Sequence, residues 1–295
     1  MKVALCFNIH YKNILVKEKI WKEWIYYNRD IITVYFHYKK NRDVPSPWIK
    51  KHCIPPSYIK ETSYFHVVPA LMSLLSYAYK DTSNRWFCLL TDSCVPIMSP
   101  VDFRNFFIKN HSFTIFRWYT PNWNIHYHRR ANLEKLPSKY HLANDPWFVI
   151  SRRDVLCCLR FTKEKIYNVI IQGIIANESV FAIALAYFSQ LDGVINRSSS
   201  LCDWTRMSSP TSPHVFKCLT DNDKKMIKKS KCIFLRKVHH TCPDDVLEEI
   251  IYPQFKRTKY TEKDLNLLYR SSFSLFWTFS FSFFGCLIFY FFFHS

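Results

Sequence analysis

The sequence predicts an α/β protein in which a mixed sheet is flanked by helices and one transmembrane helix follows at the C-terminal end. Short runs rich in β-branched and aromatic residues alternate along the chain with longer amphipathic stretches, the pattern of strands alternating with helices. The 295 residues, 48% of them apolar, are enough for one large domain with its own core. Residues 272–293 carry no charge, and about 20 apolar residues suffice to cross a bilayer.

The strands are predicted from buried, β-branched or aromatic runs. The first is Lys2–Asn8 (KVALCFN), which is too short for the core of a signal peptide. The others, in chain order, are Ile31–His37, Trp86–Leu90, Phe113–Phe116, Trp147–Ile150 and the short run Cys232–Leu235. A basic, histidine-rich stretch, His126–Tyr140, is expected to leave the core as an excursion.

The helices are predicted from apolar stripes at helical spacing. Ile20, Trp21 and Trp24 give such a stripe to the first, and Ile170–Leu191 is apolar enough to form one helix buried on most sides. The predicted helices are Ile14–Asn28, Val68–Tyr79, Ile170–Leu191, Asp221–Lys231 and Pro243–Tyr252. We therefore expect one domain over residues 1–252, a basic linker over 253–271 and the membrane span over 272–293.

Composition excludes several classes of site. The chain has only 3 glycines, too few for a P-loop or a dinucleotide-binding turn. None of its 11 cysteines form a C-x-x-C pair, which argues against zinc bound by cysteine. The formal charge of +18 fits an anionic partner, but an AT-rich coding sequence also explains it. No nucleic-acid-binding motif accompanies the charge, so no specific nucleic-acid partner is expected.

Six segments then occur in a characteristic order. They are Phe87–Ile97 (FCLLTDSCVPI), Asn144–Asp154 (NDPWFVISRRD), Ala176–Val180 (ANESV), Cys202–Thr205 (CDWT), Ser212–His214 (SPH) and Cys232–Lys237 (CIFLRK). This order resembles the core-2/I-branching β-1,6-N-acetylglucosaminyltransferases, and the motifs are most similar to those of the plant-type members. The resemblance implies a glycosyltransferase-A-like fold and inverting transfer of a sugar, N-acetylglucosamine in many members. It also implies a UDP-sugar donor, a glycan or glycoprotein acceptor, and neither a metal nor another cofactor.

The chain departs from that family at three points. Its predicted membrane span is C-terminal rather than N-terminal, and Asn177 stands where the family has an acid. The family's arginine for the diphosphate has its nearest counterpart here in His214 or Lys217. A non-catalytic, membrane-anchored glycan-binding protein on the same fold therefore stays open as an alternative. A basic binder of membranes or nucleic acids is a third possibility, supported by the charge alone.

Inverting transfer needs a base, cations for the departing diphosphate and a pocket that aligns the two substrates. Glu178 is the candidate base, because it is the only acid between Val169 and Leu191. An ordinary first-turn glutamate beside an Asn177 cap is the alternative. Lys237, with Arg236, is the candidate for binding the diphosphate, and a solvated basic face is the alternative for both.

Four further residues are candidates for the donor and acceptor pocket. Asp92 and Ser93 directly follow a predicted strand, where ligands of α/β sheets bind, although closing a turn would explain them too. Asp203 and Trp204 could line the same site, with Trp204 either stacking on a sugar or packing in the core. No metal site is expected. Asp221–Asp223 has the D-x-D spacing but precedes a helix that it would cap, and His126, His128, His239 and His240 lack partners at a recognised spacing.

The sequence also suggests an orientation in the membrane. Basic residues precede the predicted span, and positive residues favour the cytoplasmic side. We therefore expect a single-pass protein with a C-terminal anchor and a cytosolic domain, an arrangement that would suit a large DNA virus glycosylating in the cytoplasm. The basic residues are Lys256, Arg257, Lys259, Lys263 and Arg270.

Overall fold

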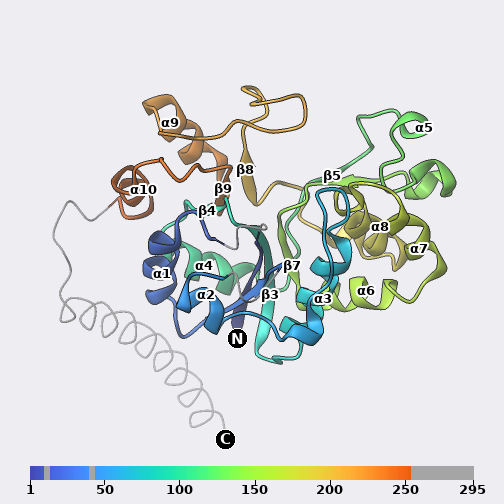
Figure 1. The fold of residues 1–295 in the computed structure, drawn as a ribbon, viewed down its shortest axis with the longest axis horizontal. Helices are drawn as coiled ribbons and strands as arrows, with labels where there is room; N and C mark the ends of the chain where they lie inside the picture. The colour runs from blue at the N-terminus through green and yellow to red at the C-terminus, as the bar shows by residue number, and fades with distance from the viewer. Residues whose placement is uncertain (10–13, 40–43, 254–295) are drawn as a thin grey trace, which may run out of the picture. The chain divides into compact units, whose positions relative to one another are not determined.

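The computed structural model describes residues 1–9, 14–39 and 44–253, and residues Met1–Pro253 form one compact unit. A four-stranded sheet in the order β2-β1-β3-β7 lies at its centre (Figure 1). Strands β1, β2 and β3 are parallel, and β7 runs antiparallel to β3, so the predicted mixed sheet is confirmed. The strand bounds are Lys2–Asn8 for β1, Ile32–His37 for β2, Asn84–Thr91 for β3 and Val149–Ser151 for β7.

Helices cover both faces of this sheet, and a separate core lies on each face. Alternate residues of β1 point to opposite faces and therefore belong to different cores. Val3, Leu5 and Phe7 belong to one core, and Ala4 and Cys6 belong to the other. The first core includes residues of α1 (Glu18–Tyr26), α4 (Pro100–Asn110), α9 (Asp221–Ser230) and α10 (Asp244–Ile251). The second includes residues of α3 (Val68–Tyr79), α6 (Arg152–Phe161), α7 (Lys165–Gln172) and α8 (Val180–Tyr187).

Two smaller sheets extend the central one. The first has the order β4-β9-β8, and its parallel pair β8–β9 places Cys202 opposite Arg236. The second joins β5 to β6. The remaining bounds are Val95–Pro96 for β4, Trp118–Tyr119 for β5, Ala143–Asn144 for β6, Ser200–Cys202 for β8, Phe234–Arg236 for β9, Pro47–Lys51 for α2 and Ile125–His128 for α5.

The predicted strand Lys2–Asn8 and helix Val68–Tyr79 agree with β1 and α3 at both ends. Most of the other predicted elements are present with ends that differ by a few residues. The strand predicted over Phe113–Phe116 is wrong. Ile115 makes only isolated bridges with Val149 and Ile195, so the pairing does not extend along the segment into a strand.

The prediction of one helix over Ile170–Leu191 is also wrong. Helix α7 ends at Gln172, a 3-10 turn spans Ala176–Glu178, and α8 begins only at Val180. The physical cause is close packing at Gly173, where a Cβ would lie 2.4 Å from the backbone nitrogen of Asn132. A continuous helix would be apolar and long enough here, but the contact with residues 131–132 requires the chain to turn.

The stretch His126–Tyr140 is not the excursion that we expected. Ala131 and Leu133 are fully buried, and Leu136 and Tyr140 are almost so. All four pack into the core that contains α3 and α8. The basic residues of the stretch alternate with these apolar ones, so that its composition conceals its contribution to the core.

None of the helices within the described residues is long and apolar enough to span a bilayer. The predicted membrane span, 272–293, and residues 254–271 of the predicted linker lie outside the described part of the chain. The C-terminal anchor and the cytosolic placement of the domain therefore stay predictions.

We expect Gly173→Ala to destabilise the domain by about 1–3 kcal/mol, because the new methyl group would meet backbone atoms that cannot move aside. In a domain of this size that corresponds to a fall in Tm of roughly 2–4 °C per kcal/mol. Gly193→Ala is the matched control, since its nearest neighbour is the flexible end of Arg153 at 3.4 Å. Equal melting temperatures for the two variants would show that the close approach at Gly173 is not required.

Candidate active site

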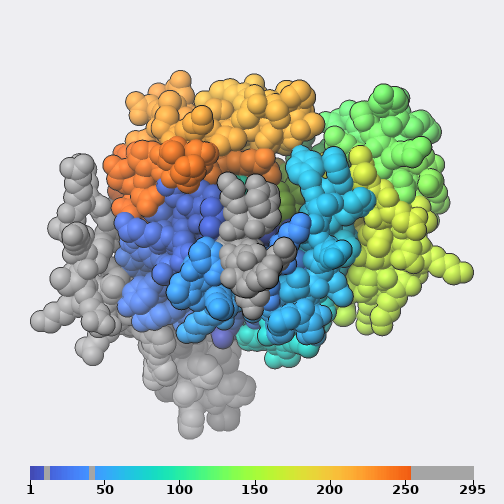
Figure 2. Space-filling view, viewed as in Figure 1, coloured from blue at the N-terminus to red at the C-terminus, as the bar shows by residue number. Residues whose placement is uncertain are grey.

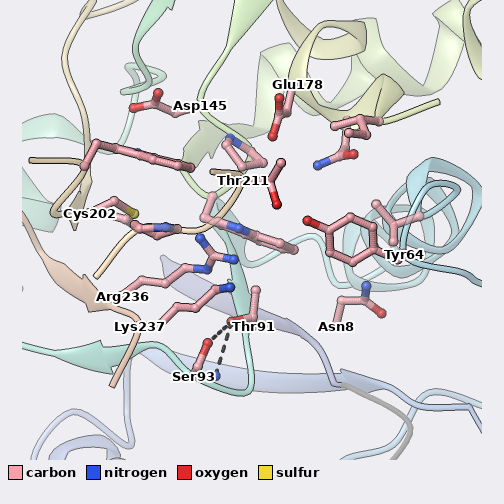
Figure 3. A pocket seen from close by; sticks show the side chains of 18 of the residues that line it. Asn8, Tyr64, Thr91, Ser93, Asp145, Glu178, Cys202, Thr211, Arg236 and Lys237 are labelled. Carbon is pink, nitrogen blue, oxygen red and sulfur yellow. Dashed lines mark hydrogen bonds between the residues drawn. The ribbon is translucent and has the colours of Figure 1, made fainter. Parts of the chain in front are cut away.

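A cleft of about 1020 Å³ opens beyond the carboxyl ends of strands from the central sheet and from the β4-β9-β8 sheet. Asn8 ends β1, Thr91 ends β3, Cys202 ends β8 and Arg236 ends β9, and all four side chains line the cleft (Figure 3). Ligands of open α/β sheets bind at this edge, because the loops that follow the strands converge there. The cleft is therefore the candidate active site.

The outer walls of the cleft come from three segments that are far apart in the sequence. They are the turn at residues 62–67, the stretch from Arg117 to Arg130 and the loop from Trp204 to Pro213. Figure 2 shows these segments, in cyan, green and orange, near one another on one face of the molecule. Two exposed aromatic side chains belong to these walls, Tyr64 with 70% and Trp204 with 52% of its surface accessible.

Glu178 is the last residue of the 3-10 turn that separates α7 from α8. Its carboxylate points into the cleft (Figure 3). Its Oε2 accepts a hydrogen bond from Arg130 Nη1 at 3.1 Å. Burial raises the pKa of Glu178, and the nearby carboxylate of Asp145 raises it further. The positive charges of Arg130 and Arg236 oppose this rise. A half-buried carboxylate with a raised pKa accepts a proton more readily than a solvated glutamate does.

The start of α8 is held by Asn144 and not by the Asn177 side chain. Asn144 Oδ1 accepts from the backbone N–H of Ala182 at 3.1 Å, and Asn144 Nδ2 donates to the carbonyl oxygen of Asn177 at 3.0 Å. Asn144 is fully buried. The alternative in which Glu178 merely follows an Asn177 cap is therefore not what the structure shows.

Arg236 and Lys237 extend from the end of β9 into the cleft (Figure 3). Lys237 is half-buried and donates from Nζ to Ser212 Oγ at 2.8 Å. Burial and the neighbouring Arg236 lower the pKa of Lys237, and Asp92 opposes this shift. The Arg236 guanidinium lies 5.6 Å from the ring centroid of Trp147, and its Nε is buried without a hydrogen-bond partner among the described residues. Neither cation lies on an open, solvated face.

Asp92 and Ser93 both line the cleft just after β3. Ser93 also closes the turn. Its backbone N–H donates to Thr91 Oγ1 at 3.2 Å, and its carbonyl oxygen accepts from the N–H of Val238 at 3.0 Å. The two functions considered for this segment, a pocket wall and a turn, therefore occur together.

Trp204 and Asp203 have different surroundings. Trp204 lines the cleft and is half exposed, so it is not a core tryptophan. Asp203 is buried and is not one of the residues that line the cleft. Burial alone would raise the pKa of Asp203, but hydrogen bonds from Thr205 and Arg206 outweigh it and lower the pKa to about 2. Asp203 thus fixes the loop that presents Trp204.

The D-x-D segment caps α9. Thr220 Oγ1 accepts from the N–H of Asp223 at 3.2 Å, and Asp223 accepts in return from the N–H of Thr220 at 2.9 Å, which forms a capping box. Asp223 also accepts a hydrogen bond from Arg206. No group of three His, Cys, Asp or Glu side chains within the described residues is placed to hold a metal ion.

Among the cleft residues that were not identified from the sequence, Arg130 and Asp145 are charged and interact with Glu178. Arg130 lies in the stretch that we expected to leave the core, and Asp145 lies inside a motif that we noted for its other residues. Asp145 accepts from Ser198 Oγ at 2.6 Å, and burial raises its pKa while Ser198 and Arg117 oppose the rise. A charged residue at the second position of NDPW was the one available signal. His214 and Lys217 are not among the lining residues.

A carboxylate and two cations face one cleft of this α/β domain, and groups of these kinds can serve the transfer of a sugar from a phosphate leaving group. Such a cleft at the strand ends of an α/β fold is consistent with a glycosyltransferase. The family model for Core-2/I-Branching enzyme matches residues 5–228. The chain belongs to this family, and the resemblance found in the sequence is confirmed. No curated protein matches the chain.

Proposed function

We propose that the protein is an inverting glycosyltransferase that moves N-acetylglucosamine from a UDP-sugar to a hydroxyl group of a glycan or glycoprotein without a metal ion. The observation that carries this proposal is that Glu178, Arg236 and Lys237 face the same cleft. A glycosyltransferase-A-like arrangement, in which the nucleotide lies at the strand ends, is consistent with the position of the cleft. The choice of N-acetylglucosamine rests on the resemblance to the family.

Glu178 would act as the base. Its carboxylate takes the proton of the acceptor hydroxyl while that oxygen attacks the anomeric carbon on the face opposite UDP. A new C–O bond forms, the bond from the anomeric carbon to the phosphate oxygen breaks, and its electron pair leaves with UDP. A single displacement of this kind inverts the configuration at the anomeric carbon.

Lys237 and Arg236 would stabilise the negative charge that develops on the diphosphate as UDP leaves. Both are partly removed from water, where an ionic interaction is stronger than at an open surface. Two cations can thus supply the charge that other glycosyltransferases obtain from a metal. Trp204 offers an exposed ring in the same cleft on which a sugar can stack.

A donor screen tests the proposal. We expect the full-length protein in detergent to release UDP from UDP-N-acetylglucosamine in the presence of a glycan acceptor, and faster than from UDP-xylose or UDP-glucuronic acid. The acceptor product should carry the sugar with inverted configuration, which NMR of the product measures. Binding of glycan without release of UDP from any donor would contradict the proposal and favour the non-catalytic alternative.

Chelation should leave turnover intact. Lys237 and Arg236 supply positive charge in the cleft, and Asp223 is already bonded to Thr220 and Arg206. We expect the rate of UDP release with EDTA to equal the rate without it, within the error of the assay. Loss of activity with EDTA and its return with Mn²⁺ would show that a metal is required.

A further inference from the structure

The Glu178 carboxylate is held by a side chain from a different part of the chain. Arg130 donates to Glu178 Oε2 at 3.1 Å, and about a quarter of each side chain is accessible. The Arg130 guanidinium also lies 4.8 Å from the ring centroid of Trp123, which covers it from another side. A base and a cation in direct contact are thus both open to the cleft.

The backbone on both sides of this ion pair is fixed. Arg130 and Ile174 form a parallel bridge, in which the N–H of Ala131 donates to the carbonyl of Ile174 at 2.9 Å and the N–H of Ile174 donates to the carbonyl of Arg129 at 3.3 Å. Asn132 Nδ2 adds a bond to the carbonyl of Val169 at 2.9 Å. The arginine and the glutamate therefore have little freedom to separate.

This arrangement uses unfavourable backbone conformations. Left-handed φ angles occur at four non-glycine residues around the pair, although such angles are uncommon outside glycine. They are Arg129 (46°), Ala131 (53°), Asn132 (48°) and Ile175 (52°). Such strain tends to concentrate at functional sites, where the surrounding structure holds it in place.

We propose that Arg130 is a positioning residue that keeps Glu178 ionised and aims its carboxylate at the acceptor hydroxyl. The inference rests on the proposed function of Glu178 as the base. Arg130 binds one carboxylate oxygen and leaves the other for the hydroxyl proton. Without Arg130, burial would keep Glu178 protonated up to a higher pH than with it. A protonated carboxyl group cannot accept the hydroxyl proton.

Five charged or titratable groups interact across the cleft here: Glu178 and, around it, Arg130, Arg236, Asp145 and Tyr119. Burial raises the pKa of Glu178, and Asp145 adds to this rise, whereas Arg130 and Arg236 oppose it. Burial, Asp145 and Glu178 raise the pKa of Tyr119. Removing the Arg130 charge removes an effect that lowers the pKa of Glu178, so this pKa rises. Because the base must be ionised, the acidic limb of the kcat/KM profile moves to higher pH.

The test compares Arg130→Gln and Arg130→Met with the control Arg160→Gln, because Arg160 is exposed on α6 and does not line the cleft. We expect both Arg130 variants to move the acidic limb upward by about one pH unit, with ~10-fold lower kcat/KM on that limb and partial recovery at higher pH. The control keeps the wild-type limb. Arg130→Met retains packing against Trp123 if Arg130→Gln fails to fold.

A second readout does not depend on turnover. The pKa of Glu178 is measured by ¹³C NMR of the labelled carboxyl groups, with its signal assigned from the spectrum of Glu178→Gln. A higher pKa in both Arg130 variants supports the proposal even if no donor is turned over, in which case the proposed function alone fails. An unchanged pKa of Glu178 in folded Arg130 variants overturns the assignment of Arg130, whatever the rate.

Discussion

Glu178→Gln is expected to lower sugar transfer by roughly 10²–10⁴-fold, the usual contribution of a positioned general base. Glutamine has the size of glutamate and its Oε1 can still accept the hydrogen bond that Arg130 donates to Glu178 at 3.1 Å. It cannot take the proton of the acceptor hydroxyl. The measurement is the initial rate of UDP release at saturating donor and acceptor, and donor affinity should hardly change because Glu178 does not act on the diphosphate.

Glu164→Gln is the matched control for this variant. Glu164 immediately precedes α7, and its carboxylate accepts from the Tyr187 hydroxyl at 2.8 Å, on residues that do not line the cleft. Its transfer rate should equal that of the wild type. Near-normal turnover of Glu178→Gln would show that another group takes the proton, and Asp145 would be the next candidate because burial raises its pKa as well.

The elements that the sequence predicted well are those whose pattern is local. The strand Lys2–Asn8 is a continuous buried run, and the helix Val68–Tyr79 has one apolar face. The break before Glu178 was missed because its cause is not local. Gly173 ends α7 through contact with Asn132, a residue that is distant in the sequence, and no periodicity in the window reveals it.

The candidate site shows the same contrast between residues that a local motif reveals and residues whose role depends on contacts distant in the sequence. Glu178, Arg236 and Lys237 could be selected because their segments resemble motifs of the family, and the structure brings all three to one cleft. Arg130 could not be selected, because its role depends on the bridge between its segment and Ile174. For Asp203 the motif was misleading. It suggested a residue of the pocket, but the Asp203 carboxylate accepts hydrogen bonds from Thr205 and Arg206 instead.

The family's arginine for the diphosphate has its nearest counterpart here in His214 or Lys217, and the structure shows where these two residues lie. His214 donates its backbone N–H to the carbonyl of Asp203 at 2.8 Å and packs its ring against Phe216. Lys217 is exposed and does not line the cleft. If neither replaces the missing arginine, the binding of UDP depends more heavily on Lys237 and Arg236, and removing one of them should have a large effect.

Lys237→Ala is therefore expected to weaken UDP binding by roughly 10–100-fold. A hydrogen bond to a charged group contributes about 1.5–3 kcal/mol, and about 1.4 kcal/mol corresponds to a tenfold change in affinity. The UDP-sugar and UDP should be affected alike, because both carry the diphosphate. Calorimetry with UDP measures the affinity, and the KM for the donor should rise in parallel.

The same binding should depend on pH in a defined direction. Because burial and Arg236 lower the pKa of Lys237, the side chain loses its charge at a lower pH than a solvated lysine would. UDP affinity of the wild type should accordingly fall as the pH rises toward that pKa, whereas the affinity of Lys237→Ala should change less. Ser212→Ala, which removes the hydroxyl that accepts from Lys237 Nζ at 2.8 Å, should cause a smaller loss than Lys237→Ala.

Lys228→Ala provides the control for a loss of positive charge alone. Lys228 is exposed on α9 and does not line the cleft, so its removal changes the net charge by the same amount without changing the site. We expect its UDP affinity and Tm to match the wild type, and the Tm of Lys237→Ala to fall little, since Lys237 is only half-buried. If Lys237→Ala and Lys228→Ala bind UDP equally well, Lys237 does not contact the diphosphate, and Arg236 would be the cation left to do so.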